Sequence, residues 1–332
     1  MAQQQQFRAL TSLKGLFILI IALHNTLAIT PLFSNIPGTA FIILFGGMLG
    51  NSMFYILSGF LLSTGYRQRI QNHSICFGDY LLRRLKKLYP MYILSNVAAL
   101  VQELVWYGVS AINVQKMVFT ALLIRGPYNN PTWFLCVLFA CYILYFFLCH
   151  FAKSQTHYIV YMTIGVIAGY SLIGADLEIL FFRSVNGMAY MNFFLGCILA
   201  EVYPLLSEKL HRRLQPLFLL LVPVLAYLLL SYGVEIIAGD VNICFSFALC
   251  PMVLYLTLVK GPCSKALQWK PFVALGEISS SIFFWHLVLY FAFCDVYTTL
   301  IPEGSIQEPQ YLLYFVLMLS FSAAAAKLGK SK

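Results

Sequence analysis

Residues 132–152 read TWFLCVLFACYILYFFLCHFA, a run of 21 residues that contains no Asp, Glu, Lys or Arg. About 20 apolar residues form a helix that crosses the ~30 Å hydrocarbon layer of a membrane. The whole chain has the same character, since 61% of its 332 residues are apolar and only 10% are charged. Soluble domains are about 45–50% apolar and about 25% charged. This composition therefore excludes nearly every soluble class.

The long apolar runs also decide between the two kinds of membrane fold. Strands of an outer-membrane barrel alternate apolar and polar residues, whereas these runs are continuous. The apolar residues are enough for about ten spans of ~20 residues. We therefore predict an all-α integral membrane protein, a bundle of about ten transmembrane helices in a single domain, residues 1–332. The expected spans are 13–33, 41–64, 88–109, 132–152, 158–175, 187–205, 215–233, 241–259, 272–294 and 310–326.

The distribution of charge predicts the orientation of the bundle. With the N-terminus in the cytosol, 18 of the 21 Lys and Arg residues fall on the cytosolic side, and only Lys116, Arg125 and Arg183 fall outside. Basic residues concentrate on the cytosolic side of membrane proteins. Both termini are therefore expected in the cytosol. The same rule explains the net charge of +9 without a nucleic-acid partner, and membrane lipids are the expected surroundings.

Neither a metal site nor a nucleotide-hydrolysis site is predicted. The nine cysteines lie mostly inside apolar runs and lack the paired spacing of a zinc site. The sequence contains no Walker loop, no Gly-rich dinucleotide fingerprint and no HExxH motif. ATP hydrolysis and zinc chemistry therefore receive no support.

The first predicted helix carries polar residues in a segment that lipid would otherwise surround. Lys14 lies at its cytosolic end, and His24, ten residues later, lies about 15 Å deeper. Polar groups at this depth normally face the bundle or a water-filled cavity. Histidine suits proton transfer near neutral pH, and Asn25 adds a second polar group beside it. The alternative is that His24 only forms a hydrogen bond between helices.

A dense basic cluster precedes the third predicted span. Arg83, Arg84, Lys86 and Lys87 lie within five residues. They suit a ligand with several phosphates, such as a nucleotide or coenzyme A. The alternative is a topology signal that contacts anionic lipid headgroups. Along the following helix a polar stripe formed by Tyr92, Asn96 and Glu103 is typical of a helix that lines a cavity.

Two further helices carry candidate pocket residues. In the second, Asn51, Tyr55 and Ser58 share one face. Ser58 is a candidate substrate contact, while the glycines of that helix indicate close helix packing. In the ninth, Trp285 and His286 are candidates for the wall of a pocket opposite His24. A buried histidine bonded to a neighbouring helix is the alternative.

Five segments, in order and on matching sides of the membrane, resemble acyltransferase family 3. These integral membrane acyltransferases have about ten helices. The segments are the run from Lys14 to His24, FYILSGFLL at 54–62, RRLKKLYP at 83–90, TWFLCVLF at 132–139 with Trp133, and LGEISSSIFFWH at 275–286.

The resemblance implies an activity and a set of site residues. The activity is transfer of an acyl group, commonly acetyl, from cytosolic acyl-coenzyme A to a hydroxyl group of an extracytoplasmic envelope glycan or glycolipid. A bacterial-type plasma membrane is the implied location. Lys14 and His24 would form the active-site pair, and Arg84 and Lys87 would bind coenzyme A, assisted by Arg83 and Lys86. Family members usually have ten residues between the basic residue and the histidine, whereas nine separate Lys14 from His24, and Asn25 holds the usual position.

Two alternatives share the same composition. A transporter or lipid flippase could use His24, Glu103 and His286 to relay protons or line a path, although no inverted repeat is evident. A membrane scaffold without catalysis leaves the basic cluster and His24 unexplained. If the protein is an enzyme, its outer segments 110–131 and 295–309 are expected to help select the acceptor. The candidate glycan contacts there are Arg125, Tyr128, Asn129, Asn130 and Trp133.

Overall fold

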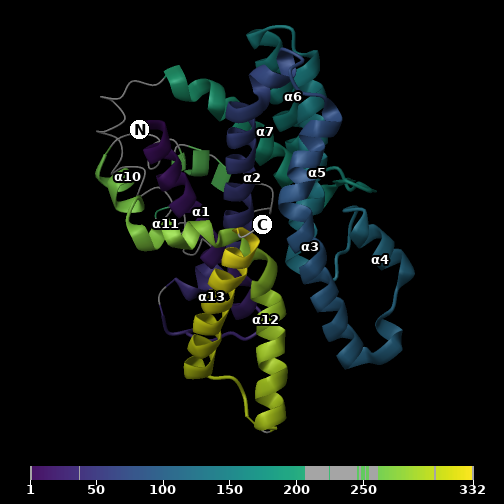
Figure 1. Cartoon of the computed structure of the whole chain (residues 1–332), viewed down its shortest axis with the longest axis vertical. Helices are drawn as coiled ribbons and strands as arrows, with labels where there is room; N and C mark the ends of the chain where they lie inside the picture. The colour runs from purple at the N-terminus through teal and green to yellow at the C-terminus, as the bar shows by residue number, and fades with distance from the viewer. Residues whose placement is uncertain are drawn as a thin grey trace.

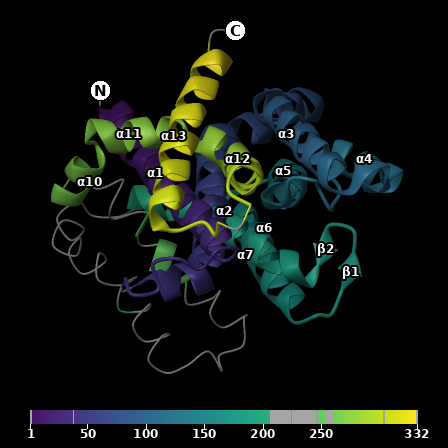
Figure 2. The same cartoon turned by 90° about the horizontal axis from the view of Figure 1, so that it is seen from below.

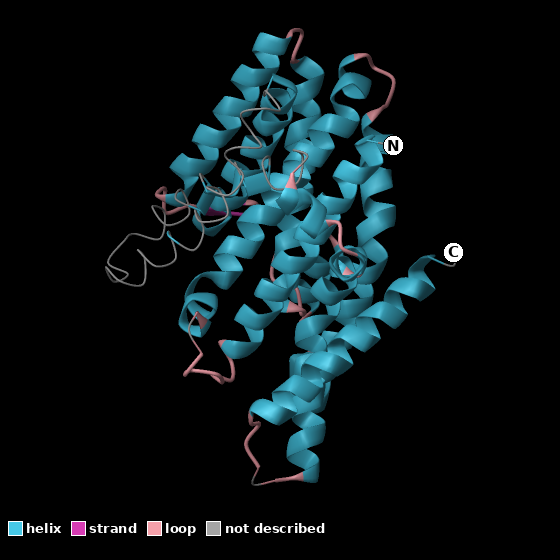
Figure 3. Cartoon of the chain, turned by 90° about the vertical axis from the view of Figure 1, so that its left-hand side faces the viewer, coloured by secondary structure: helices cyan, strands magenta, loops and turns pink. Residues whose placement is uncertain are grey.

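The computed structural model describes residues 2–36, 38–205, 224, 245–246, 248–250, 252–253, 261–302 and 304–330. Within these residues nearly every segment is helical, and eight helices are long and apolar enough to cross a membrane. Figure 3 shows the helices, and the described residues contain one short antiparallel pair of strands. The prediction of an all-α membrane bundle is therefore confirmed.

The eight spanning helices coincide with eight of the ten predicted spans. They are α1 (Ala2–Leu27), α2 (Thr39–Gln71), α3 (Phe77–Tyr107), α5 (Trp133–Phe151), α6 (Gln155–Ile173), α7 (Gly187–Val202), α12 (Ser279–Leu300) and α13 (Glu308–Lys330). The other two predicted spans, 215–233 and 241–259, lie almost entirely outside the described residues. The shorter elements are α4 (Val114–Ala121), α10 (Pro262–Leu267), α11 (Lys270–Glu277), β1 (Glu178–Ile179) and β2 (Phe182–Arg183).

Helix α2 packs against α1, α5 and α7 (Figure 1). Its glycines make two of these contacts close. A Cβ atom on Gly59 would lie 1.9 Å from the carbonyl oxygen of Phe193 in α7, and one on Gly50 would lie 2.3 Å from Ile21 Cγ1 in α1. The prediction that small residues of this helix let neighbouring helices approach is confirmed.

The predicted span at 272–294 begins too early, because the chain breaks at Ile278 and the spanning helix α12 starts only at Ser279, after the short helix α11. Figure 1 shows α11 crossing the view while α12 runs downward. Helix α11 crosses α1 so closely that a Cβ atom on Gly276 would lie 1.9 Å from the carbonyl oxygen of Thr11. At the break the Ser279 hydroxyl donates to the Gly276 carbonyl at 2.7 Å, which satisfies an acceptor at the end of α11. The break places the start of α12 beside α1.

Helix α3 begins at Phe77, well before the predicted position 88, so the basic cluster lies inside the helix. The Cys76 thiol caps the helix by accepting a hydrogen bond from the Asp79 N–H. On a helix, residues three apart share a face, and adjacent residues differ by about 100°. Arg84 therefore shares a face with Lys87, and Arg83 shares a different face with Lys86.

Two segments outside the spanning helices lie on the same side of the bundle. Figure 2 shows α4 and the β1–β2 hairpin there, next to α5 and α6. The hairpin pairs Glu178 with Arg183 and Ile179 with Phe182. The hairpin segment lines the larger of the two cavities described next, and α4 lines a separate surface hollow.

Candidate functional site

Two cavities lie inside the bundle and share part of their walls. The larger has a volume of about 770 Å³ and is lined from α1, α2, α5, α12, the loop before α5 and the hairpin segment. The smaller has a volume of about 370 Å³ and is lined from α1, α2, α3, α5, α11 and α12. Asn51 and Phe283 line both. The predicted topology places the larger cavity toward the outside and the smaller toward the cytosol, and we call them the outer and inner cavities.

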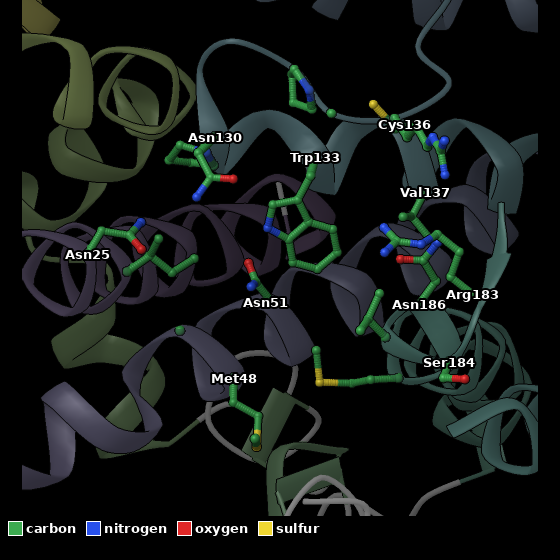
Figure 4. A pocket seen from close by; sticks show the side chains of 18 of the residues that line it. Asn25, Met48, Asn51, Asn130, Trp133, Cys136, Val137, Arg183, Ser184 and Asn186 are labelled. Atoms are coloured by element: carbon green, nitrogen blue, oxygen red, sulfur yellow. The ribbon is translucent and has the colours of Figure 1, made fainter. Parts of the chain in front are cut away.

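The outer cavity is polar at its centre and at both sides. In Figure 4, Trp133 and Asn51 face each other, Asn25 and Asn130 lie to one side, and Arg183 lies to the other. The indole, amide and guanidinium groups give this cavity both a flat apolar surface and hydrogen-bonding groups. Such a combination suits a polar ligand that carries rings or several hydroxyl groups.

His24 lines the outer cavity from α1 with one ring nitrogen already engaged. Its Nδ1–H donates to the carbonyl oxygen of Ile42 at 3.1 Å. In the neutral ring the proton therefore resides on Nδ1, and Nε2 is left as a proton acceptor. The ring lies against Gly47, where a Cβ atom would be 2.5 Å from Nε2. His24 thus has the tautomer and the fixed orientation that a general base requires.

Asn25 is held by a histidine that lies behind the cavity. The His286 Nδ1–H donates to the carbonyl oxygens of Ile282 and Phe283 at 3.0 and 2.9 Å. His286 Nε2 is therefore an acceptor, and it receives the Asn25 amide N–H at 2.9 Å. His286 is fully buried and lines neither cavity. It acts on the outer cavity only through Asn25, whose Oδ1 remains as an acceptor.

The inner cavity gathers three basic side chains from two helices. Lys14 comes from α1, and Arg84 and Lys87 come from the shared face of α3. The Arg84 guanidinium lies 4.3 Å from the centre of the Tyr66 ring. Its Nε is buried and has no hydrogen-bond partner among the described residues. A buried N–H without a partner is costly, so this guanidinium is placed to receive an anionic ligand.

Arg83 and Lys86 are exposed and line neither cavity. Their positions on α3 follow from the helical period, since each is about 100° from its neighbour in the Arg84–Lys87 pair. The sequence placed all four cations close together, and the helix separates them into two pairs. The Arg83–Lys86 pair, which lines neither cavity, remains able to contact anionic lipid headgroups.

The chain matches the family model described as an acyltransferase domain over residues 7–327, nearly its whole length. It belongs to acyltransferase family 3. No curated protein and no solved structure matches the chain. Because of the family match, the protein is a membrane acyltransferase. The transporter alternative gains no support.

In this acyltransferase the shorter spacing between Lys14 and His24 leaves both residues at a cavity. Lys14 lines the inner cavity, and both His24 and Asn25 line the outer one. Helix α1 therefore presents two residues to the outer cavity. They are His24 and Asn25, and Asn25 holds the position that the family's histidine usually occupies. The shorter spacing therefore leaves the His24 imidazole at the outer cavity.

The polar stripe of α3 lies outside both cavities and supports the outer segment instead. The Tyr92 hydroxyl donates to the Thr120 carbonyl at 2.9 Å. Asn96 donates to Thr132 at 3.1 Å and accepts the Asn129 N–H at 2.9 Å. Glu103 forms an ion pair with Lys116 at 2.9 Å. These bonds fix the loop that leads into α5 and thereby position Asn130 and Trp133.

Ser58 lines the inner cavity, and Trp133 lines the outer one. Phe283 lines both cavities. Nothing in the sequence distinguishes it from the other phenylalanines, of which the chain has 28 in all. Asn51 was visible in the sequence as a polar residue on the Ser58 face of its helix. Its place in the walls of both cavities depends on how α2 meets α12, which the sequence does not show.

Gly47→Ala is expected to lower turnover by about 10²-fold, because a shift of about 1 Å in a catalytic group can cost that much. The added Cβ atom would lie 2.5 Å from His24 Nε2 and 2.6 Å from Cδ2, which forces the ring to move. Steady-state assays of the purified variant measure the effect. Gly65→Ala is the matched control, since it lies in the same helix and its Cβ would meet no atom of the described residues within 4 Å. Equal turnover in both variants would contradict the placement of His24.

Proposed function

We propose that this protein is a membrane O-acyltransferase that moves an acyl group, acetyl in the simplest case, from cytosolic acyl-coenzyme A to a hydroxyl group of an extracytoplasmic cell-envelope glycan or glycolipid. The observation that carries the proposal is the pair of neighbouring cavities that share Asn51 and Phe283 in their walls. One cavity is basic and lies toward the cytosol in the predicted topology. The other contains His24. A bacterial plasma membrane is the proposed location.

The inner cavity fits a phosphate-bearing donor. Arg84 supplies a planar guanidinium whose buried Nε–H has no partner among the described residues, and Lys14 and Lys87 supply two ammonium groups. Arginine binds phosphate through paired hydrogen bonds, and lysine contributes a mobile point charge. These residues hold the phosphates of acyl-coenzyme A, whose thioester supplies the activated acyl carbonyl.

The outer cavity fits the acceptor. His24 Nε2 removes the proton of an acceptor hydroxyl as its oxygen bonds to the acyl carbon and the bond from that carbon to sulfur breaks. The proton passes from His24 to the departing thiolate. A general base of this kind contributes about 10²–10⁴ in rate. Asn25, held by His286, offers Oδ1 to an acceptor hydroxyl, and the Trp133 indole offers a flat face to a sugar ring.

The first test is release of free coenzyme A by the purified full-length protein in nanodiscs supplied with acetyl-coenzyme A. We expect release only when a crude envelope glycan fraction is also present, together with acetyl ester on the glycan by mass spectrometry. Release without any acceptor would indicate a hydrolase. Absence of both binding and consumption of acetyl-, propionyl- and succinyl-coenzyme A would overturn the proposal.

A further inference from the structure

The three basic residues that the topology places outside come together in the fold. Lys116 of α4, Arg125 of the following loop and Arg183 of β2 line one surface hollow of about 320 Å³. Arg125 and Arg183 also line the outer cavity that contains His24. We call Lys116, Arg125 and Arg183 the basic rim. It stands where an acceptor would enter the cavity.

The basic rim keeps unneutralised positive charge. Lys116 is paired with Glu103, and Arg183 uses its Nε to bind Glu178 at 2.5 Å. Arg125 forms no ion pair within the described residues. Among those residues, no Asp or Glu lines either the hollow or the outer cavity. Two carboxylates beside three cations leave one net positive charge at the rim, which an anionic ligand would complement.

The segments that carry the two arginines are held in place. The Tyr190 hydroxyl and the Asn186 amide each donate to the Phe181 carbonyl at 2.9 Å, which fixes the β1–β2 hairpin. The Asn129 side chain donates to the Phe284 carbonyl at 2.7 Å, which fixes the loop that follows Arg125. An anchored backbone segment loses less entropy than a mobile one when the arginine that it carries binds an anion.

Membrane insertion does not account for this cluster, because the positive-inside rule favours few cations at the outer end. Resting on the proposed function, we propose that the acceptor is an anionic carbohydrate whose carboxylate or phosphate is bound by Arg125 and Arg183. A carboxylate and a phosphate each offer two oxygen atoms that accept the paired N–H groups of a guanidinium. The acceptor sugar then lies between the rim and His24, in reach of Trp133 and Asn130.

The test uses pairs of soluble oligosaccharides that differ in one group: a glucuronic-acid oligosaccharide against its carboxyl-reduced form, and a phosphorylated one against its dephosphorylated form. Nanodiscs of phosphatidylcholine alone exclude anionic headgroups. Release of coenzyme A from acetyl-coenzyme A measures turnover, and binding of each labelled oligosaccharide is measured separately without donor. We expect the anionic member of at least one pair to be preferred in both measurements.

Arg125→Gln and Arg183→Gln should each raise KM for the anionic member about tenfold, the effect of one lost hydrogen bond to a charged group. KM for the neutral member should not change. Glu178→Gln is the matched control with the opposite expected effect on KM. It removes the carboxylate that pairs with Arg183 of the basic rim, and it should lower KM for the anionic member. Binding of acetyl-coenzyme A serves as the folding control and should be the same in all variants.

The outcomes separate the two proposals. Equal use of both members, or an equal rise in KM for both in the arginine variants, would overturn the anionic acceptor and leave the acyltransferase proposal standing. Arginine-dependent binding of the anionic member without any release of coenzyme A would keep the anionic ligand and overturn the proposed reaction. A dependence on the arginines that appears only when phosphatidylglycerol is added would assign the rim to lipid headgroups and overturn the inference.

Discussion

His24→Ala is expected to lower kcat by about 10²–10⁴, the usual contribution of a general base, while binding of acetyl-coenzyme A stays unchanged. Its Nδ1–H is committed to the Ile42 carbonyl, so Nε2 is the atom left to accept a proton. The cations that we propose to bind the donor lie in the inner cavity, which His24 does not line. The change removes one hydrogen bond between helices, which is worth about 1 kcal/mol, so the variant should fold.

Two additions make this result specific. Imidazole added to the His24→Ala protein should restore part of the lost rate, because the deleted ring leaves space in a cavity of about 770 Å³. His157→Ala is the matched control, since His157 is exposed at the start of α6 and lines neither cavity. If His24→Ala kept its turnover, His24 would not be the general base.

The length and order of the spanning helices were predictable because the requirement they meet is local. A helix in lipid needs about 20 apolar residues wherever it occurs, and the stretch at 132–152 satisfies that alone. The break at Ile278 was not predictable in this way. It accompanies the crossing of α11 over α1, where Gly276 meets Thr11. That contact joins residues from opposite ends of the chain, and no local pattern records it.

The candidate site was predictable to the extent that a polar residue in an apolar helix must find a partner. This reasoning singled out His24 and Asn25, which line the outer cavity. The same reasoning singled out Asn96, because a polar residue in an apolar helix needs a partner, but the sequence does not show which group that partner is. Asn96 forms its hydrogen bonds with Thr132 and Asn129 rather than with a ligand in a cavity. Only the packing of the helices separates residues that face a ligand from residues that face another segment.

The sequence likewise did not show that α3 divides the basic cluster into two pairs. This division leads to the second prediction with a large expected effect. Arg84→Ala is expected to raise KM for acetyl-coenzyme A by about 10- to 100-fold, since hydrogen bonds to charged groups contribute about 1.5–3 kcal/mol. Arg84 lines the inner cavity, and its buried Nε has no hydrogen-bond partner in the part of the chain that the structure describes. Arg84→Lys keeps the charge and loses the planar fork, so its KM should lie between those of the wild type and Arg84→Ala.

Arg83→Ala is the matched control for this prediction, because Arg83 is the adjacent residue with the same charge and is exposed outside both cavities. A shortened donor, acetyl-pantetheine, tests the contact itself, since it keeps the thioester and lacks the nucleotide. The Arg84→Ala protein and the wild type should use it equally well, because the contact that Arg84 makes is already absent. An equal loss with both donors, or an equal effect of Arg83→Ala and Arg84→Ala, would contradict phosphate binding by Arg84 and make the cluster a signal for membrane topology alone.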